Sequence, residues 1–176
     1  MISGSSGGGK SSLLEELASR GFVVVPEAGR QLAKEQIAIG GVAMPGTVMF
    51  GHLLLSRSMY LYNQAVAMAP KGPVFFDRSI VEPIAYWWSM GEMEPHLEQA
   101  VAQYRYARDV FMVPPWPEIF TKDAERLHSY DPDQKEYARL TDAFKAFGYR
   151  LVEVPKISVS ARADFVESHL NSIGLL

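Results

Sequence analysis

Residues 4–11 carry the most specific chemical pattern of the chain. They read Gly-Ser-Ser-Gly-Gly-Gly-Lys-Ser and fit the phosphate-loop (Walker A) motif G-x-x-x-x-G-K-[ST] at every fixed position. The glycines let the backbone curl so that successive N–H groups point inward at phosphate oxygens. Lys10 adds a cation for the β- and γ-phosphates of ATP, and the Ser11 hydroxyl is suited to ligate Mg²⁺. We therefore expect ATP and Mg²⁺ to bind on the residues of this loop, namely Gly4, Ser5, Ser6, Gly7, Gly8, Gly9, Lys10, Ser11 and Ser12.

The same stretch allows a second interpretation as the nucleophile turn of a serine hydrolase. It contains G-x-S-x-G from Gly4 through Ser6 to Gly8, and Asp131 and His169 follow in the chain order of such a triad. That serine normally follows several strands of a sheet, whereas almost nothing precedes Ser6. A flexible linker is a further alternative, but an amphipathic helical pattern follows at once. The phosphate loop is the favoured interpretation.

Asp77 directly follows a short apolar run, Val74–Phe76, and is itself followed by Arg78. In a phosphate-loop fold, an aspartate at such a strand end can hold Mg²⁺ directly or through water. Capping of the next helix is the alternative role for Asp77. Arg78 is a candidate for binding phosphate or substrate, with a structural ion pair as the alternative.

Glu27 lies at the end of another apolar run, residues 22–25, and Arg30 follows three residues later. Active sites of open α/β sheets lie at the carboxyl ends of the strands. Glu27 is therefore a candidate general base or substrate ligand, with a solvated loop acid as the alternative. Arg30 is a candidate for holding an anionic or polar acceptor, and Arg57 is a weaker one.

A polar segment flanked by prolines, about residues 118–132, is predicted to form a lid over the site. Lids that close on phosphates often bring in an arginine and exclude water. Arg126 is the candidate for that arginine, and a solvated run of charges is the alternative.

The elements that position these residues follow from the hydrophobic pattern. Four short runs, rich in Val and Phe and apolar on both faces, alternate with segments of helical period, which is typical of a parallel sheet. This alternation predicts an α/β fold with right-handed crossovers, in a single domain over residues 1–176. The expected strands are 22–25, 74–76, 110–113 and 151–154. The expected helices are 10–20, 47–68 with Phe50, Leu53, Leu54 and Leu61 inward, 84–90, 134–147 capped by Asp133, and 160–173.

The composition excludes several classes of function. A net charge of −3 leaves no broad basic face for nucleic acid, and the absence of cysteine excludes disulfides and thiolate chemistry. Residues 37–56 lack charged side chains over the length of a membrane span, but glycines and a proline interrupt them, which favours a loop and a buried helix. No secretory signal is visible, so a cytoplasmic protein without membrane contact is expected.

Several short motifs, taken in order, resemble the predicted-ATPase group of small phosphate-loop proteins of the AAA-domain type. This group is similar to the nicotinamide riboside kinase domain and, more distantly, to nucleoside and nucleotide kinases. The motifs are the phosphate loop, Pro26-Glu27-Ala28 with Arg30, Phe76-Asp77-Arg78-Ser79, Val113-Pro114-Pro115-Trp116, Asp123 with Glu125-Arg126, and Val154-Pro155 followed by Val159, Arg162, Phe165 and Val166.

The resemblance implies a three-layer fold of nucleoside-kinase type, with about five parallel strands and a lid over Mg-ATP. It further implies that an acid like Glu27 accepts the proton of the phosphoryl acceptor and that residues 155–159 border the adenine. The chain departs from the family pattern in having only three residues, 1–3, ahead of the loop.

Together these observations predict an ATP- and Mg²⁺-dependent phosphotransferase acting on a small molecule such as a nucleoside, nucleotide or riboside. The alternative is an ATPase or a nucleotide-gated switch without such an acceptor; the N-K-x-D sequence of guanine-specific switches is absent. The predicted catalytic residues are Lys10, Glu27, Asp77 and Arg126; the substrate ligands are Glu27, Arg30 and Arg78; and the metal ligands are Ser11 and Asp77.

Overall fold

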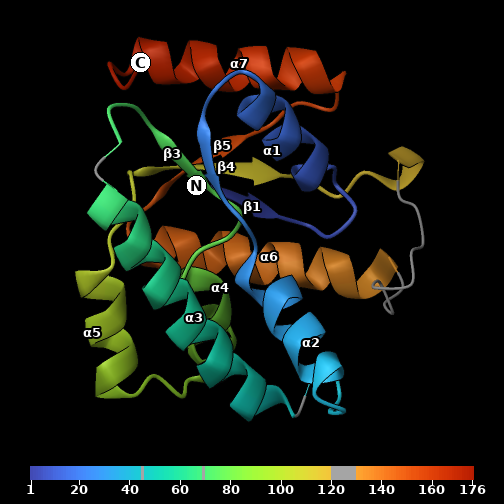
Figure 1. Cartoon of the computed structure of the whole chain (residues 1–176), viewed down its shortest axis with the longest axis vertical. Coiled ribbons are helices and arrows are strands. Elements are labelled where there is room, and N and C mark those ends of the chain that lie inside the picture. Colours follow the sequence, from blue (N-terminus) through green and yellow to red (C-terminus); the bar gives the residue numbers. More distant parts are fainter. Residues whose placement is uncertain (45, 69, 120–129) are drawn as a thin grey trace.

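The described residues form five short parallel strands that lie side by side in the order β2-β3-β1-β4-β5 (Figure 1). The computed structural model describes residues 1–44, 46–68, 70–119 and 130–176, with the side chains of 130–133 left out. A bridge between Ile2 and Asp77 connects the β2-β3 pair to the β1-β4-β5 group. The strands are β1 (Ile2–Gly4), β2 (Val23–Val25), β3 (Val74–Phe76), β4 (Asp109–Val113) and β5 (Arg150–Glu153).

The two central strands are the most deeply buried part of the sheet. Every residue of β1 and β4 is buried, whereas β2 and β5 at the edges keep partly exposed positions such as Val23. A central strand is covered by helices on both faces and paired on both sides, so its residues are apolar or small, apart from Asp109 at the start of β4. The very short run ahead of the loop is therefore a full member of the sheet.

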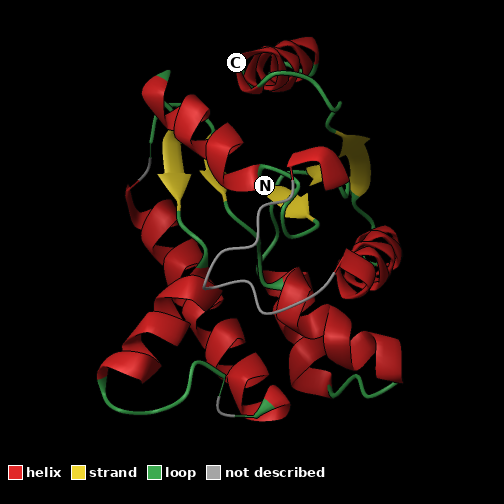
Figure 2. Cartoon of the chain, turned by 90° about the vertical axis from the view of Figure 1, so that its right-hand side faces the viewer, coloured by secondary structure: helices red, strands yellow, loops and turns green. Residues whose placement is uncertain are grey.

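Helices cover both faces of the sheet and complete three layers (Figure 1, Figure 2). One face carries α1 and α7, which pack against each other, and the other carries α3, α4 and α6, with α2 and α5 farther out. The predicted three-layer α/β fold is confirmed. The helices are α1 (Lys10–Ser19), α2 (Ala28–Ala38), α3 (Thr47–Met68), α4 (Val81–Met90), α5 (Pro95–Gln103), α6 (Tyr130–Ala146) and α7 (Val159–Ser172).

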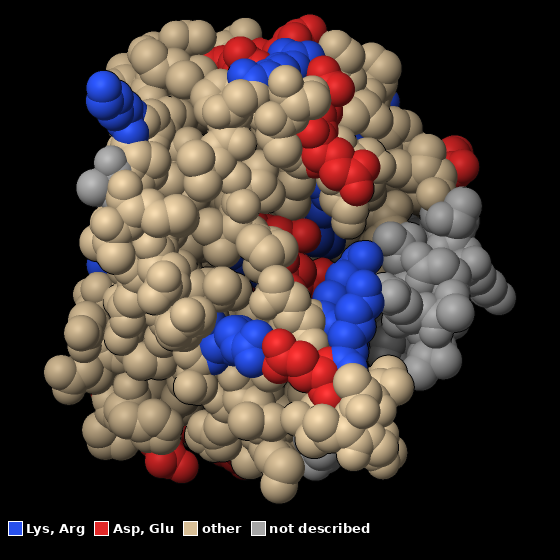
Figure 3. Space-filling model, in the orientation of Figure 1, with Lys and Arg blue, Asp and Glu red and all other residues tan. Residues whose placement is uncertain are grey.

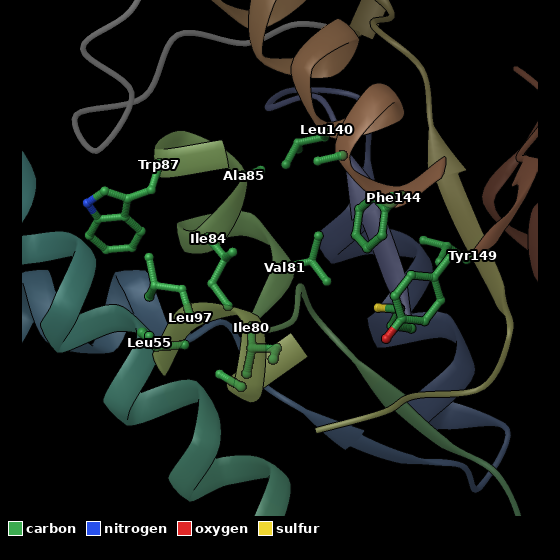
Figure 4. Packing of buried hydrophobic residues seen from close by; sticks show 14 of the residues in the cluster. Leu55, Ile80, Val81, Ile84, Ala85, Trp87, Leu97, Leu140, Phe144 and Tyr149 are labelled. Carbon is green, nitrogen blue, oxygen red and sulfur yellow. The ribbon is translucent and has the colours of Figure 1, made fainter. Parts of the chain in front are cut away.

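Two apolar clusters hold the layers together, one on each face of the sheet. The larger cluster centres on α4, where Ile84 and Trp87 pack toward α3, α5 and α6 (Figure 4). Gly51 of α3 lies against Trp87, and a Cβ there would come within 2.7 Å of the indole. In the smaller cluster, Leu13 and Leu17 of α1 pack together with residues of α7 and of the strands that these two helices cover.

Some expectations about the helices are wrong in detail. The segments α2 and α5 were not expected as helices, because each buries only two residues, Ala28 and Leu32 in α2 and Leu97 and Ala100 in α5, so no long apolar stripe marks them in the sequence. The helix α6 begins at Tyr130, so Asp133 lies inside it and does not cap it. Leu53 of α3 is exposed, and Leu55, Ser58 and Ala65 are the buried residues, because α3 is apolar on more than one face.

The predicted lid is described only at its two ends. Glu118 lies in a short 3₁₀ turn, Pro117–Ile119, and residues 130–132 form the start of α6 instead of lid. Residues 120–129, with Arg126, lie outside the described residues. Among the helices in the described ranges, none has the length and apolar character needed to cross a membrane.

Candidate active site

The loop between β1 and α1 has the backbone that its glycines were expected to allow. Gly4, Gly7 and Gly9 have φ values of 115°, 73° and 82°, in the left-handed region that favours glycine. A Cβ on Gly4 would lie 2.2 Å from the carbonyl oxygen of Val113, so β4 leaves no room for a side chain there. Gly9 is the N-cap of α1, and the loop therefore surrounds the positive end of that helix.

Lys10 lies within this loop and is almost fully buried, with 8% of its surface exposed. Its Nζ donates to the carbonyl oxygen of Ser5 over 2.6 Å and to that of Gly4 over 3.2 Å. Burial, together with Arg78, lowers the pKa of Lys10 to about 8, and the nearby carboxylates of Asp77 and Glu27 oppose that shift. The ammonium is thus held at the mouth of the loop, facing the acids of β2 and β3.

Glu27 follows β2, where it is the N-cap of α2, and its carboxylate binds two arginines. Oε1 lies 3.1 Å from Nε of Arg78, and Oε2 accepts a hydrogen bond of 3.1 Å from Nε of Arg30. Burial alone would raise the pKa of Glu27, but Arg78, Lys10 and Arg30 outweigh it and hold the pKa below its usual value. Glu27 is therefore an ionised carboxylate, and the predicted residues Glu27, Arg30 and Arg78 lie together.

Arg78 has a φ of 69°, a conformation that is costly for any residue other than glycine. Its backbone N–H donates to the carbonyl oxygen of Ile2, and its side chain lies between Glu27 and Glu136 of α6, with Nη1 3.3 Å from the Glu136 carboxylate. Such strain is concentrated at functional sites, where surrounding contacts maintain it. The conformation turns the guanidinium back across the carboxyl ends of β2 and β3.

Asp77 contrasts with Glu27 because one of its oxygens accepts no hydrogen bond from the described residues. Among the described residues, its buried Oδ1 accepts no hydrogen bond. Burial and the neighbouring Glu27 raise the pKa of Asp77 to about 6, although Lys10 and Arg78 act in the opposite direction. A buried carboxylate oxygen without a donor is suited to a cation.

The residues present fit Mg²⁺ bound together with a polyphosphate. Ser11 is half-buried in the first turn of α1, and Asp77 supplies the unpartnered oxygen. No cluster of three or more acidic, His or Cys ligands occurs in the part of the chain that the structure describes. Mg²⁺ commonly needs only one or two protein oxygens when phosphates and water complete its shell.

A small pocket lies beside this group of charges. Glu27, Asp77 and Arg78 form its polar wall, and Leu54, Leu61 and Phe76 are among its apolar residues. Its volume of about 20 Å³ is that of a single water molecule. Figure 3 shows acidic and basic side chains meeting in a hollow in the middle of one face of the molecule.

Three residues of the site were not predicted from the sequence. The buried Glu82 of α4 accepts hydrogen bonds from Ser3 Oγ (2.5 Å) and from Ser79 Oγ (2.6 Å), tying β1 to the start of α4. The spacing S-x-x-E from Ser79 to Glu82 is a helix-start signature and would have indicated this pair. Glu136 on α6 and Arg162 on α7 come from distant parts of the chain; Arg162 belongs to a motif of the family resemblance but was given no role, and no local pattern marks Glu136.

The structure contradicts the serine-hydrolase alternative. Ser6 follows the carboxyl end of β1, whereas His169 contacts Asp109 at the amino end of β4, with Nε2 2.6 Å from Oδ2. Ser6 and His169 are thus not brought together. The weaker candidate Arg57 does not line the pocket and forms an ion pair of 2.7 Å with Glu35.

Comparison with known proteins agrees with this geometry. A family model described as "AAA domain" matches residues 1–162. Among curated proteins, no sequence matches the chain. Similar solved structures include a deoxyadenosine kinase from M. mycoides with the products dCMP and a flexible dCDP bound (14% identity, TM-score 0.66, 97% of both chains). The same enzyme with bound dATP (15%, 0.55, 97% of both chains) and thymidylate kinase from Candida albicans (14%, 0.65, 98% of this chain and 90% of that one) are also similar.

At these sequence identities the solved structures establish the fold, and the family model, which spans most of the chain, establishes the family. Both agree with the resemblance inferred from the motifs, which is thereby confirmed. The chain belongs to the AAA-domain family of phosphate-loop proteins and has the parallel α/β fold of nucleoside and nucleotide kinases.

Proposed function

We propose that this protein is an ATP- and Mg²⁺-dependent phosphotransferase whose acceptor is a small molecule such as a nucleoside, nucleotide or riboside. The observation that carries the proposal is the pocket beside the loop, whose polar wall contains Glu27, Asp77 and Arg78. Lys10 interacts electrostatically with all three residues. An anion-binding loop and a pocket that meet at the same acids are the arrangement that direct phosphoryl transfer requires.

The donor is bound by the loop and the start of α1. The backbone N–H groups of the loop and Nζ of Lys10 bind the β- and γ-phosphates, and Lys10 exchanges its two loop carbonyls for phosphate oxygens. Ser11 and Asp77 hold Mg²⁺, which neutralises charge on the phosphates when bound. Arg126 is proposed to add a further positive charge.

The acceptor is held by Glu27. Its carboxylate accepts a hydrogen bond from the acceptor hydroxyl, whose oxygen forms the new bond to the γ-phosphorus while the bond to ADP breaks. Because Arg78 and Arg30 hold the pKa of Glu27 low, Glu27 takes the proton late, after the hydroxyl has begun to bond to phosphorus. A loose transition state of this kind depends more on positioning than on a strong base.

The pocket must widen to admit an acceptor larger than water. Its apolar wall comes from Leu54 and Leu61 of α3, and Ala28 of α2 also lines it. Helices α2 and α3 pack on each other, and neither belongs to the central strands β1 and β4. Movement of this pair would therefore open the pocket without disturbing the central strands.

A screen with γ-labelled ATP tests the proposal. The protein is incubated with Mg²⁺, labelled ATP and separate pools of nucleosides, nucleoside monophosphates and ribosides, with the Lys10→Ala variant as control. We expect one pool to accelerate ATP consumption and to yield a labelled organic product with the wild type only. Slow ATP hydrolysis that no pool accelerates would instead support the ATPase or switch, and failure to bind ATP would reject both.

A further inference from the structure

Arg162 is the largest fully buried side chain in the described part of the chain, with 1% of its surface exposed. It lies in the first turn of α7 and contacts the phosphate loop from that helix. Its Nη2 donates to the carbonyl oxygen of Gly8 over 3.1 Å, and Nη1 to that of Gly9 over 3.4 Å. The guanidinium also lies over the ring of Trp116, 5.7 Å from its centroid.

This buried cation has no carboxylate partner among the residues that the structure describes. Its Nε is buried and has no hydrogen-bond partner among the described residues. Burial also lowers the pKa of Arg162 below its usual value. A charge in such a place costs free energy unless an opposite charge compensates it. Two backbone carbonyls offer only partial compensation.

The geometry of the peptide bond links Arg162 to the interior of the loop. In a trans peptide the C=O and N–H groups point in opposite directions. The carbonyl of Gly8 shares its peptide with the N–H of Gly9, and the carbonyl of Gly9 shares its peptide with the N–H of Lys10. By holding both carbonyls from the α7 side, Arg162 turns these two N–H groups toward the opposite side, where the phosphates are proposed to bind.

The contact with Arg162 requires glycine at position 9 of the loop. A Cβ on Gly9 would come within 2.7 Å of Nη1 of Arg162, so a side chain there would displace the guanidinium. The carbonyl of Gly9 also accepts the first helical hydrogen bond of α1, from the N–H of Leu13 at 3.2 Å. The carbonyl of Gly8 lies ahead of the helix, and Arg162 supplies its donor.

We infer that Arg162 is a positioning residue for the polyphosphate, which aims the N–H groups of Gly9 and Lys10 and places a positive charge behind them. This role rests on the proposed binding of a nucleotide by the loop. The bound phosphates would supply the negative charge that no described residue places against Arg162. Because Arg162 is buried behind the loop, it acts on the ligand through the backbone and does not touch it.

Arg162→Met tests this inference, because it keeps much of the side-chain volume and removes the charge and both hydrogen bonds. Arg20→Met is the matched control, since Arg20 also connects α1 to α7, through Asp164 and Glu167, but does not contact the loop. Titration calorimetry with Mg-ATP and with Mg²⁺ and inorganic triphosphate gives the dissociation constants. We expect Arg162→Met to weaken both ligands about tenfold or more, because two donors lose their orientation, and Arg20→Met to leave both unchanged.

The outcomes separate this inference from the function on which it rests. If the wild type binds neither Mg-ATP nor triphosphate, the proposed function fails. If the wild type binds both and Arg162→Met binds them equally well, or if Arg20→Met weakens them as much, the positioning role is wrong. Arg162→Lys, which keeps the charge and one donor, should recover part of the affinity and provides the test if Arg162→Met does not fold.

Discussion

Replacing Asp77 by Asn should stabilise the protein and impair its activity at the same time. The substitution keeps the shape of the side chain and removes its charge. In the ligand-free protein Asp77 has a buried oxygen that accepts no hydrogen bond from the described residues, and burial and Glu27 raise its pKa to about 6. The ionised carboxylate is therefore a destabilising group as long as no cation binds it.

The magnitude follows from the change in pKa. A rise from the usual 3.8 to about 6 corresponds to about 3 kcal/mol at 1.36 kcal/mol for each tenfold change in the ionisation constant. Because Asp77 keeps some contact with solvent, we expect Asp77→Asn to increase the free energy of unfolding by only about 1–2 kcal/mol. The folded state binds the proton more tightly than the unfolded state, so the free energy of unfolding falls as pH rises from about 4 to about 6 and is constant above that range. The gain from Asp77→Asn should thus be fully present at pH 7.5 and absent near pH 4.

Urea denaturation at these two pH values, without nucleotide or Mg²⁺, measures the effect. Asp142→Asn, at an exposed position on α6, is the control and should change the free energy of unfolding by less than about 0.5 kcal/mol. In the phosphotransfer assay, Asp77→Asn should lower turnover and weaken its dependence on Mg²⁺ together. A variant that is destabilised at pH 7.5, or that shows the same difference at both pH values, would mean that the ionised Asp77 does not destabilise the folded protein.

Three further predictions concern the other residues of the site. Mg-ATP at a hundredfold excess over its dissociation constant should increase the free energy of unfolding of the wild type by about 2.7 kcal/mol and raise its melting temperature. Lys10→Ala should lose most of this rise in melting temperature, and an equal rise would contradict the role of Lys10. Because burial lowers the pKa of Lys10 to about 8, calorimetry should find Mg-ATP binding about tenfold weaker at pH 9 than at pH 7.5, with proton uptake at the higher pH. An affinity that does not change between these pH values would argue against binding of the phosphates by the Lys10 ammonium. Glu27→Gln should slow phosphoryl transfer about 10²-fold while nucleotide affinity is retained. If Glu27→Gln instead weakens Mg²⁺ binding and leaves turnover at saturating Mg²⁺ unchanged, the roles assigned to Glu27 and Asp77 are reversed.

The parts of the molecule that depend on local pattern could be predicted from the sequence. The phosphate loop, the apolar strands and the position of Asp77 and Glu27 after them are local features, and each lies where a parallel α/β sheet requires. The helices α2 and α5 were missed because their buried residues are few, and the inward face of α3 was mistaken because that helix is apolar all round. In these segments tertiary packing decides what local preference leaves open.

The connections within the site could not be predicted in the same way. Glu136 and Arg162 follow the loop by more than a hundred residues, and they reach the site because α6 and α7 cover opposite faces of the sheet. The pairing of Glu27 with Arg78 depends on the left-handed backbone of Arg78, which the sequence of β3 does not indicate. The sequence predicted that these charges share one active site, and the fold shows which of them pair.

The central claim is that the γ-phosphoryl group passes directly from ATP to a small molecule. The most direct test is the reaction in ¹⁸O-labelled water, with Mg-ATP and a mixture of deoxynucleosides, nucleoside monophosphates and nicotinamide riboside, followed by mass spectrometry of every phosphorylated species. We expect a phosphorylated acceptor that contains no ¹⁸O, formed in step with ADP and absent with Lys10→Ala. Formation of ADP matched only by inorganic phosphate that carries one ¹⁸O would mean that the protein transfers the phosphoryl group to water and is not a small-molecule kinase.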